Sequence, residues 1–165
     1  MNYIVRKIRQ SEIQLLSDFL YEAIFIPKGA ASPPREIINQ PELQVYVSDF
    51  GKLDDDICYV AEVEGRIIGT VWVRIMDDYG HIDDETPSLA ISLKKEYRGQ
   101  GIGTSLMKTM LAELKERGYK QTSLAVQKAN YAIKLYKSVG FETVDENEEE
   151  YIMVCKLSAL QASIC

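Results

Sequence analysis

A length of 165 residues suits a single domain over residues 1–165, and a formal net charge of −6 argues against nucleic acid as a partner, because such binding begins with the neutralisation of phosphates. No stretch approaches the ~20 apolar residues of a membrane span, and the N-terminus lacks the apolar core of a signal peptide, so we expect a cytoplasmic protein with no membrane segment. The 3 cysteines are odd in number and widely spaced, which argues against a disulfide framework and against a zinc site, and no metal is expected.

The N-terminal half of the chain predicts a strand, several helices and a hairpin. Apolar and polar residues alternate in the first strand, and Ser11 is expected to cap the helix that follows. Prolines between Ile26 and Pro41 favour a long loop, and the dipeptide Glu64-Gly65 lies between two apolar runs, as is typical of a hairpin turn. The predicted elements are a strand at Tyr3–Arg9, helices at Glu12–Phe25, Arg35–Asn39 and Glu42–Phe50, and strands at Ile57–Val63 and Arg66–Met76.

The C-terminal half predicts alternating strands and helices followed by a closing strand pair. Its longest helix carries apolar residues at every fourth position from Ile102 to Leu114, and Gly118 supplies a left-handed end. The predicted elements are a strand at Ser88–Leu93, a helix at Ile102–Arg117, a strand at Thr122–Gln127, a helix at Asn130–Val139, strands at Glu142–Asp145 and Tyr151–Leu157, and a frayed tail at Ser158–Cys165.

The segment Tyr97–Thr104 is the most informative part of the sequence. Gly99, Gly101 and Gly103 leave the backbone bare between a predicted strand and a predicted helix, so a ligand can approach the main-chain amides. The first N–H groups of a helix lack partners within the helix and favour negative charge. This segment therefore predicts a phosphate-binding loop. Its spacing fits neither the dinucleotide fingerprint nor the Walker A loop.

Two stretches of the sequence resemble signatures of one enzyme family. Arg98–Gly103 resembles the R/Q-x-x-G-x-G/A signature of the GNAT-superfamily N-acetyltransferases. Asn130–Phe141 is similar to the second signature of that family, N-x-x-A-x-x-x-Y-x-x-x-G-F, although its Ala comes one place early. The two stretches stand in the family's order with the expected strand between them, and the resemblance is specific over residues 88–141.

This resemblance implies a fold and a co-substrate. The fold is α/β (α+β in some schemes), with a mixed, strongly twisted sheet of about six to seven strands and helices on both faces. Ser88–Leu93 and Thr122–Gln127 form its parallel pair. The co-substrate is acetyl-CoA, from which an acetyl group passes to an amine by direct attack within a ternary complex.

The resemblance also implies a set of site residues. The loop amides hold the pyrophosphate of the co-substrate, and a bulge in the preceding strand frees main-chain groups for the pantetheine arm. Asn130 either caps a helix or bonds to that arm, and Tyr136 either packs or protonates the leaving thiolate. The implied co-substrate contacts are Ile91, Ser92, Leu93, Arg98, Gly99, Gln100, Gly101, Ile102, Gly103, Thr104, Asn130 and Tyr136.

The general base and the acceptor stay open at this stage. The base is His81, one of the acids at 83–85 or water, and Trp72, Arg74 and Tyr46 either border the acceptor site or belong to the core. The acceptor is a small-molecule or peptide amine, and a homodimer is one option for the assembly. Two other functions compete: a non-catalytic acyl-CoA sensor, and a protein that binds another phosphate ligand such as a nucleotide. The three acids among the base candidates are Asp83, Asp84 and Glu85.

Overall fold

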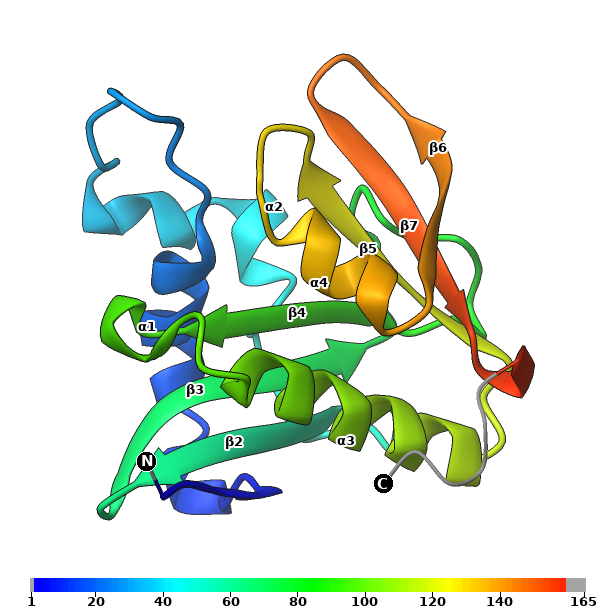
Figure 1. Cartoon of the computed structure of the whole chain (residues 1–165), viewed down its shortest axis with the longest axis horizontal. Helices are drawn as coiled ribbons and strands as arrows, with labels where there is room; N and C mark the ends of the chain where they lie inside the picture. The colour runs from blue at the N-terminus through cyan, green and yellow to red at the C-terminus, as the bar shows by residue number, and fades with distance from the viewer. Residues whose placement is uncertain (1, 160–165) are drawn as a thin grey trace.

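The computed structural model describes residues 2–159, which form a seven-stranded mixed sheet with helices on both faces (Figure 1). The strand order across the sheet is β1-β2-β3-β4-β5-β7-β6, and only the pair β4–β5 is parallel. Both features agree with the expected fold. The strands are β1 (Ile4–Lys7), β2 (Ile57–Val63), β3 (Arg66–Arg74), β4 (Ser88–Leu93), β5 (Gln121–Gln127), β6 (Phe141–Glu146) and β7 (Glu150–Lys156).

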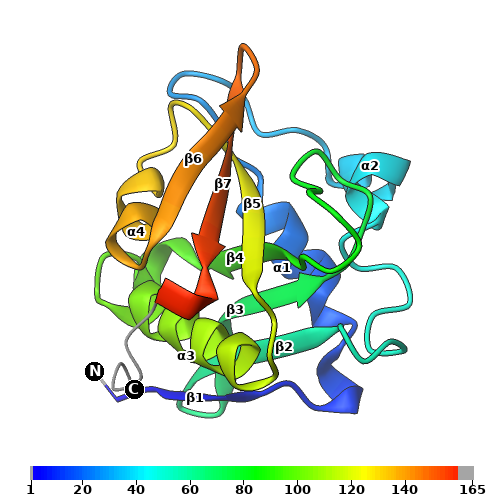
Figure 2. The same cartoon turned by 90° about the vertical axis from the view of Figure 1, so that its right-hand side faces the viewer.

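The helices cover the two faces of the sheet separately. Figure 2 shows α3 (Ile102–Glu116) and α4 (Ile133–Ser138) on one side, and α1 (Leu15–Ala23) and α2 (Pro41–Gln44) on the other. Four short 3₁₀ turns complete the chain at Gln10–Glu12 (η1), Arg35–Asn39 (η2), Lys95–Tyr97 (η3) and Leu157–Ala159 (η4). None of the helices within residues 2–159 is long and apolar enough to cross a membrane.

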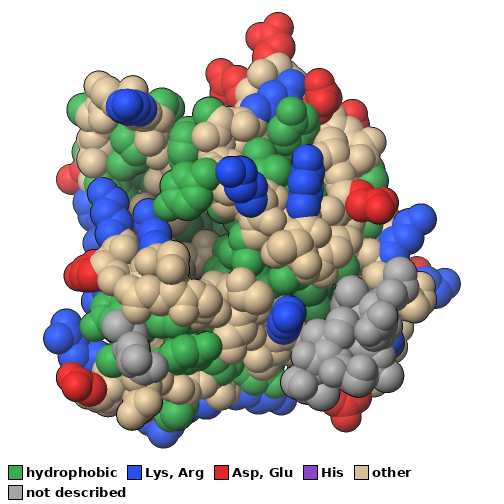
Figure 3. Space-filling view, viewed as in Figure 1, with side chains coloured by type: hydrophobic (Ala, Val, Ile, Leu, Met, Phe, Trp, Pro, Cys, Tyr) green, Lys and Arg blue, Asp and Glu red, His purple; other side chains and the backbone are tan. Residues whose placement is uncertain are grey.

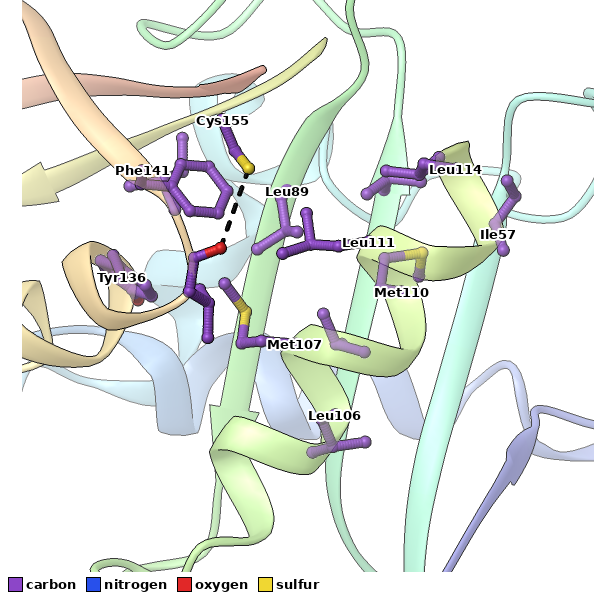
Figure 4. Packing of buried hydrophobic residues seen from close by; sticks show 14 of the residues in the cluster. Ile57, Leu89, Leu106, Met107, Met110, Leu111, Leu114, Tyr136, Phe141 and Cys155 are labelled. Carbon is purple, nitrogen blue, oxygen red and sulfur yellow. Dashed lines mark hydrogen bonds between the residues drawn. The ribbon is translucent and has the colours of Figure 1, made fainter. Parts of the chain in front are cut away.

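Each face of the sheet has its own hydrophobic core. The α3 face buries the apolar row that the sequence predicted, and Leu106, Met110 and Leu114 of that row have no exposed surface (Figure 4). The α1 face buries Leu16 and Leu20 of α1 against Trp72 of β3. Burial of a large apolar side chain contributes roughly 1.5–3 kcal/mol, so these two cores hold the helices against the sheet.

Several element boundaries follow from local sequence signals. The β2–β3 hairpin turns at Glu64 and Gly65, whose φ values of 51° and 80° are both left-handed, as in the two-residue turns that match strand twist. Helix α3 ends before Gly118, which has a φ of 92°. The N–H of Tyr119 then returns to the carbonyl of Leu114 at 3.1 Å, which closes the helix in the predicted way.

Other predicted boundaries were wrong. Ser11 caps no helix, because it lies inside η1, and α1 begins only at Leu15. The carboxylate of Glu12 accepts the N–H of Arg9 at 2.8 Å and caps η1, while α1 has no side-chain cap. The predicted helix at Glu42–Phe50 shortens to α2, which is followed by turns, and the predicted helix at Asn130–Val139 shortens to α4. In the predicted tail, Ser158 belongs to η4, while Leu160–Cys165 lie outside the described residues.

Strands β4 and β5 diverge from a single point of contact. Their only register pair within the described chain is Ser88 with Ser123, although both strands continue for several residues beyond it. Strand β4 remains paired with β3 along its whole length without a register shift, so the expected bulge is absent there. Strand β5 follows β7 instead. Each strand therefore keeps the twist of its antiparallel partner, and the sheet opens between β4 and β5.

Candidate active site

The opening between β4 and β5 lies beside the glycine loop and α4. Figure 3 shows a hollow at this place, between the chain before α3 and the chain around α4, with Lys and Arg side chains around it. Alternate residues of a strand direct their N–H and C=O groups to opposite edges. Because β4 pairs with β3 on one edge only, half of its main-chain groups face the opening.

The glycine loop presents an unobstructed backbone at the start of α3. Gly99 and Gly101 have φ values of 73° and 87°, which L side chains rarely adopt, and a Cβ built on either meets no atom within 4 Å. A Cβ on Gly103 would lie 3.4 Å from Leu135 of α4. The loop therefore has the bare amides that the sequence predicted, with Ile102, Gly103 and Thr104 forming the first turn of the helix.

The side chain of Arg98 is directed away from the glycine loop. Its Nε donates to the carbonyl of Leu93 at 2.9 Å, and its Nη2 lies 3.9 Å from Glu22 of α1. The carbonyl of Leu93 is thus already bonded, contrary to the expectation of a free group. Gln100 donates to the carbonyl of Glu96 at 3.0 Å and closes the turn before the helix.

Two residues of β4 differ in their surroundings. Ile91 packs half-buried against the core on the α3 face. Ser92 points to the opposite face, is 4% exposed, and its Oγ has no hydrogen-bond partner in the described part of the chain. An unpaired buried hydroxyl costs free energy.

Tyr136 of α4 belongs to the hydrophobic core on the α3 face of the sheet (Figure 4). Its ring is 8% exposed and meets Phe141 edge to face at 6.1 Å between centroids. Burial raises the pKa of its hydroxyl to about 12, and no hydrogen-bond partner for that hydroxyl occurs among residues 2–159. The phenol therefore keeps its proton at neutral pH, with no bond inside the chain to hold it.

Asn130 stabilises the approach to α4. Its Oδ1 accepts the N–H of Ala132 at 2.9 Å, which closes a turn just before α4, whereas the helix itself has no side-chain cap. The side-chain NH₂ makes no hydrogen bond within the described chain and is available to an acceptor outside it.

The acetyltransferase (GNAT) family model matches residues 21–141 of the chain. The chain belongs to the GNAT family. An N-alpha-acetyltransferase from Sulfurisphaera tokodaii is 30% identical over 115 residues, which are 60% of this chain and 68% of the relative. A probable N-acetyltransferase, camello, from Xenopus laevis is 34% identical over 94 residues, which are 54% of this chain and 41% of the relative. The chain thus spans less than half of the length of that relative.

Solved structures share the fold of this GNAT chain. The PaiA N-acetyltransferase of Thermoplasma acidophilum, crystallised with coenzyme A, superposes with a TM-score of 0.70, 22% identity, and coverage of 94% of this chain and 99% of that one. A ribosomal-protein-S18-alanine N-acetyltransferase from Escherichia coli gives a TM-score of 0.66 at 17% identity, covering 98% of each chain. At such identities the likeness concerns the fold alone.

The candidate general bases of this GNAT chain lie in the β3–β4 loop, where they are hydrogen-bonded within the loop or exposed to solvent. His81 Nδ1 contacts the carbonyl of Met76 at 2.9 Å, and its Nε2 lies 3.6 Å from Asp84, whose side chain is 96% exposed. Asp83 accepts the N–H of Glu85 at 2.9 Å, and both residues are exposed. None of these contacts joins the four candidate bases, His81, Asp83, Asp84 and Glu85, to β4.

A carboxylate that the sequence analysis did not single out does reach β4. Asp78 accepts a hydrogen bond from Ser88 Oγ at 2.9 Å and another from the hydroxyl of Tyr46 at 3.0 Å. These partners are 10 and 32 residues away in the chain. Local sequence patterns carry no signal of such contacts, so only the tertiary structure identifies Asp78.

Trp72 and Arg74 belong to the core rather than to a pocket wall. Trp72 has no exposed surface, and its Nε1 donates to the carbonyl of Tyr46 at 3.0 Å. Arg74 is 8% exposed, pairs with Asp56 at 3.2 Å, and donates to the carbonyl of Ser48 at 2.8 Å. Both side chains therefore anchor the segment after α2 to the sheet.

A second hollow, a groove of about 520 Å³, runs along the outer side of α3. Thr104, Ser105 and Lys108 line it together with two acids, Glu113 and Glu116. The two carboxylates would repel a polyphosphate, so the groove suits such a ligand less well than the glycine loop at its end. Among the described residues, no group of three or more His, Cys, Asp or Glu side chains is arranged to hold a metal ion.

Proposed function

We propose that this protein transfers an acetyl group from acetyl-CoA to a primary amine by direct attack in a ternary complex. The observation that carries the proposal is the opening between β4 and β5, with a bare glycine loop beside it and Tyr136 in the core on the α3 face. Family membership supports the same reaction.

In this proposal the co-substrate is bound mainly by backbone groups. The amides of Gly99–Thr104 bind the pyrophosphate, since they combine free N–H groups with the positive end of the α3 dipole. Main-chain groups of Ile91 face the opening and bind the pantetheine arm, whereas those of Ser92 face β3, as do those of Lys94. The free amide of Asn130 adds a hydrogen bond. Arg98 supports the loop through its bond to Leu93.

The reaction forms one bond and breaks another. The neutral amine nitrogen attacks the thioester carbonyl, and a C–N bond forms as the carbonyl oxygen becomes an oxyanion. A backbone N–H of β4 stabilises that oxyanion. The C–S bond then breaks, the thiolate takes a proton, and the nitrogen loses one, so the products are an acetamide and coenzyme A.

Tyr136 is the proposed donor of the proton to the thiolate. A phenol with a pKa of about 12 is a weak acid in its resting state. It can nevertheless act as the general acid, because its proton is positioned to move as negative charge develops on the sulfur. Its hydroxyl has no bond within the described chain to break first.

A screen of acceptor amines tests the proposal. The protein is incubated with acetyl-CoA and each amine, and free thiol is measured against a blank without amine. Amine-dependent thiol release, with the acetylated amine found by mass spectrometry, is the expected result. Binding of acetyl-CoA without thiol release for any amine would favour the sensor function, and thermal stabilisation by nucleotides but not by coenzyme A would favour the nucleotide alternative.

A further inference from the structure

Asp78 lies where β4 leaves β5, on the sheet face opposite to Tyr136. Its partner Ser88 is the β4 residue that pairs with β5, and its partner Tyr46 packs in the core on the α1 face. Tyr136 packs in the core on the α3 face. The opening between the strands is therefore flanked by a carboxylate on one face and a phenol on the other.

The position of Asp78 is fixed by contacts on both sides. Trp72 holds the backbone of Tyr46, and the Tyr46 hydroxyl in turn holds the carboxylate at 3.0 Å. On the other side, Ser123 Oγ donates to the carbonyl of Gly80 at 2.7 Å, which pins the loop onto β5. A carboxylate held by two hydroxyl donors is a preorganised acceptor of hydrogen bonds.

Among residues 2–159, no cation balances the negative charge at this place. Asp78 is half-buried, as is Glu150 at the start of β7, and neither forms an ion pair with any residue in the described range. The buried carboxylate of Asp56, by contrast, is paired with Arg74. The pKa of Glu150 is raised by burial, by Glu149 and by Asp78, so a cation bound between the two acids would relieve their repulsion.

A second observation indicates a ligand in the same opening. Ser92, which lies on the same face of β4 as Ser88, is 4% exposed, and its Oγ has no hydrogen-bond partner within residues 2–159. A buried hydroxyl ordinarily finds one. The unpaired hydroxyl of Ser92 and the unbalanced carboxylate of Asp78 lie on the same face of β4, and together they indicate a polar site on the α1 side of the opening.

We propose that Asp78 binds the acceptor as an ammonium ion, so that the enzyme selects cationic primary amines over neutral amines and over acceptors with an acidic group beside the amine. This inference rests on the proposed acetyl transfer. The carboxylate positions the ammonium on the α1 face of the opening. Glu150 or water then takes one proton, and the neutral nitrogen attacks the thioester.

The test compares benzylamine, which is an ammonium ion at neutral pH, with aniline, which is neutral there. Asp78→Asn should lower kcat/KM for benzylamine about 10- to 100-fold, mostly through KM, because one charge-assisted hydrogen bond is lost. The value for aniline should change less than about threefold, and the KM for acetyl-CoA should stay the same. Asp77→Asn, which alters the exposed neighbouring residue, is the matched control and should behave as wild type.

The possible results separate a failure of the proposed acetyl transfer from a failure of the proposed role of Asp78. If the wild-type protein acetylates no amine, the proposed function fails and the inference fails with it. If the wild type is active but prefers aniline, or Asp78→Asn keeps the wild-type ratio of benzylamine to aniline, only the inference is overturned. Should Asp78→Asn not fold, Tyr46→Phe removes one anchor of the carboxylate, and an unchanged KM for benzylamine in that variant also overturns it.

Discussion

At the residue scale, Tyr136 and Asp78 differ in how they are held. The phenol is fixed by packing alone, with its ring against Phe141 and its hydroxyl without a partner in the described chain. The carboxylate is fixed by two hydroxyl donors. A proton donor benefits from a free hydroxyl, whereas a binding group benefits from a fixed one, so the two environments suit the two proposed roles.

The variant Tyr136→Phe keeps the ring and removes the proton donor. General acid catalysis typically contributes about 10²–10⁴-fold, so kcat should fall within that range while binding of acetyl-CoA barely changes. Steady-state kinetics with the best amine of the screen and calorimetry with acetyl-CoA measure the two effects. Tyr131→Phe, at an exposed position in the loop before α4, is the control. Full activity of Tyr136→Phe would leave the residue a packing role only.

At the element scale, the glycine loop and the far end of α3 use the same backbone conformation for different purposes. Gly101 precedes the helix with a φ of 87°, and Gly118 follows it with a φ of 92°, and a Cβ on either meets no atom within 4 Å. The left-handed conformation costs an L residue about 1–2 kcal/mol. Substitution at either glycine should therefore lower the free energy of unfolding by a similar amount. Only Gly101 adjoins the proposed phosphate site.

Because the two glycines have the same backbone conformation, Gly101→Val and Gly118→Val form a matched pair of variants. Both should lose about 1–2 kcal/mol in free energy of unfolding, measured by urea titration. Only Gly101→Val should lose affinity for coenzyme A, by about 10- to 100-fold, because its side chain keeps the phosphates from the amides. Equal affinity in the two folded variants would exclude the loop as the phosphate site.

The contact between β1, η1 and β2 should depend on pH. Arg6 bonds to Glu12 at 2.8 Å and to Glu62 at 2.8 Å, and the bond from Arg6 lowers the pKa of Glu12 from 4.5 to about 2. Because the pKa is lower in the folded state, Glu12 stabilises the fold above pH 4.5 and loses this effect as the pH falls toward 2. Glu12→Gln should cost about 1–2 kcal/mol at neutral pH and almost nothing at the acidic limit.

Urea titrations of both proteins across that pH range measure the difference. Glu148→Gln, in an exposed turn, serves as the control and should follow the wild type at every pH. A difference in free energy of unfolding between Glu12→Gln and wild type that stays constant with pH would contradict the assigned role of the Arg6 contact.

At the scale of the whole molecule, local signals in the sequence predicted most of the fold. The bounds of β2 and β4 agree with the prediction, and α3 differs by one residue, because periodicity, turns and caps are local properties. The glycine loop was also predicted, since backbone freedom is visible in the residue type. The predicted starts of α1 and α4 were wrong because Glu12 and Asn130 each bond to a backbone N–H ahead of the helix and stabilise a turn there, which composition does not reveal.

The candidate site was less predictable from the sequence than the fold was. Arg98 bonds to Leu93 instead of facing the loop, and Trp72 and Arg74 are buried anchors. The link from Tyr46 to Asp78 joins residues 32 positions apart. Such contacts depend on how loops pack over the sheet, and this packing leaves no periodic pattern in the chain.

The central claim is that acetyl-CoA lies in the opening between β4 and β5, and a titration followed by amide NMR tests it most directly. Addition of acetyl-CoA to the isotope-labelled protein should shift the amide signals of Gly99–Thr104 and of Ile91–Leu93 with a common dissociation constant. Shifts confined to the groove on the outer side of α3, around Lys108 and Glu113, or no shift in β4, would contradict the account.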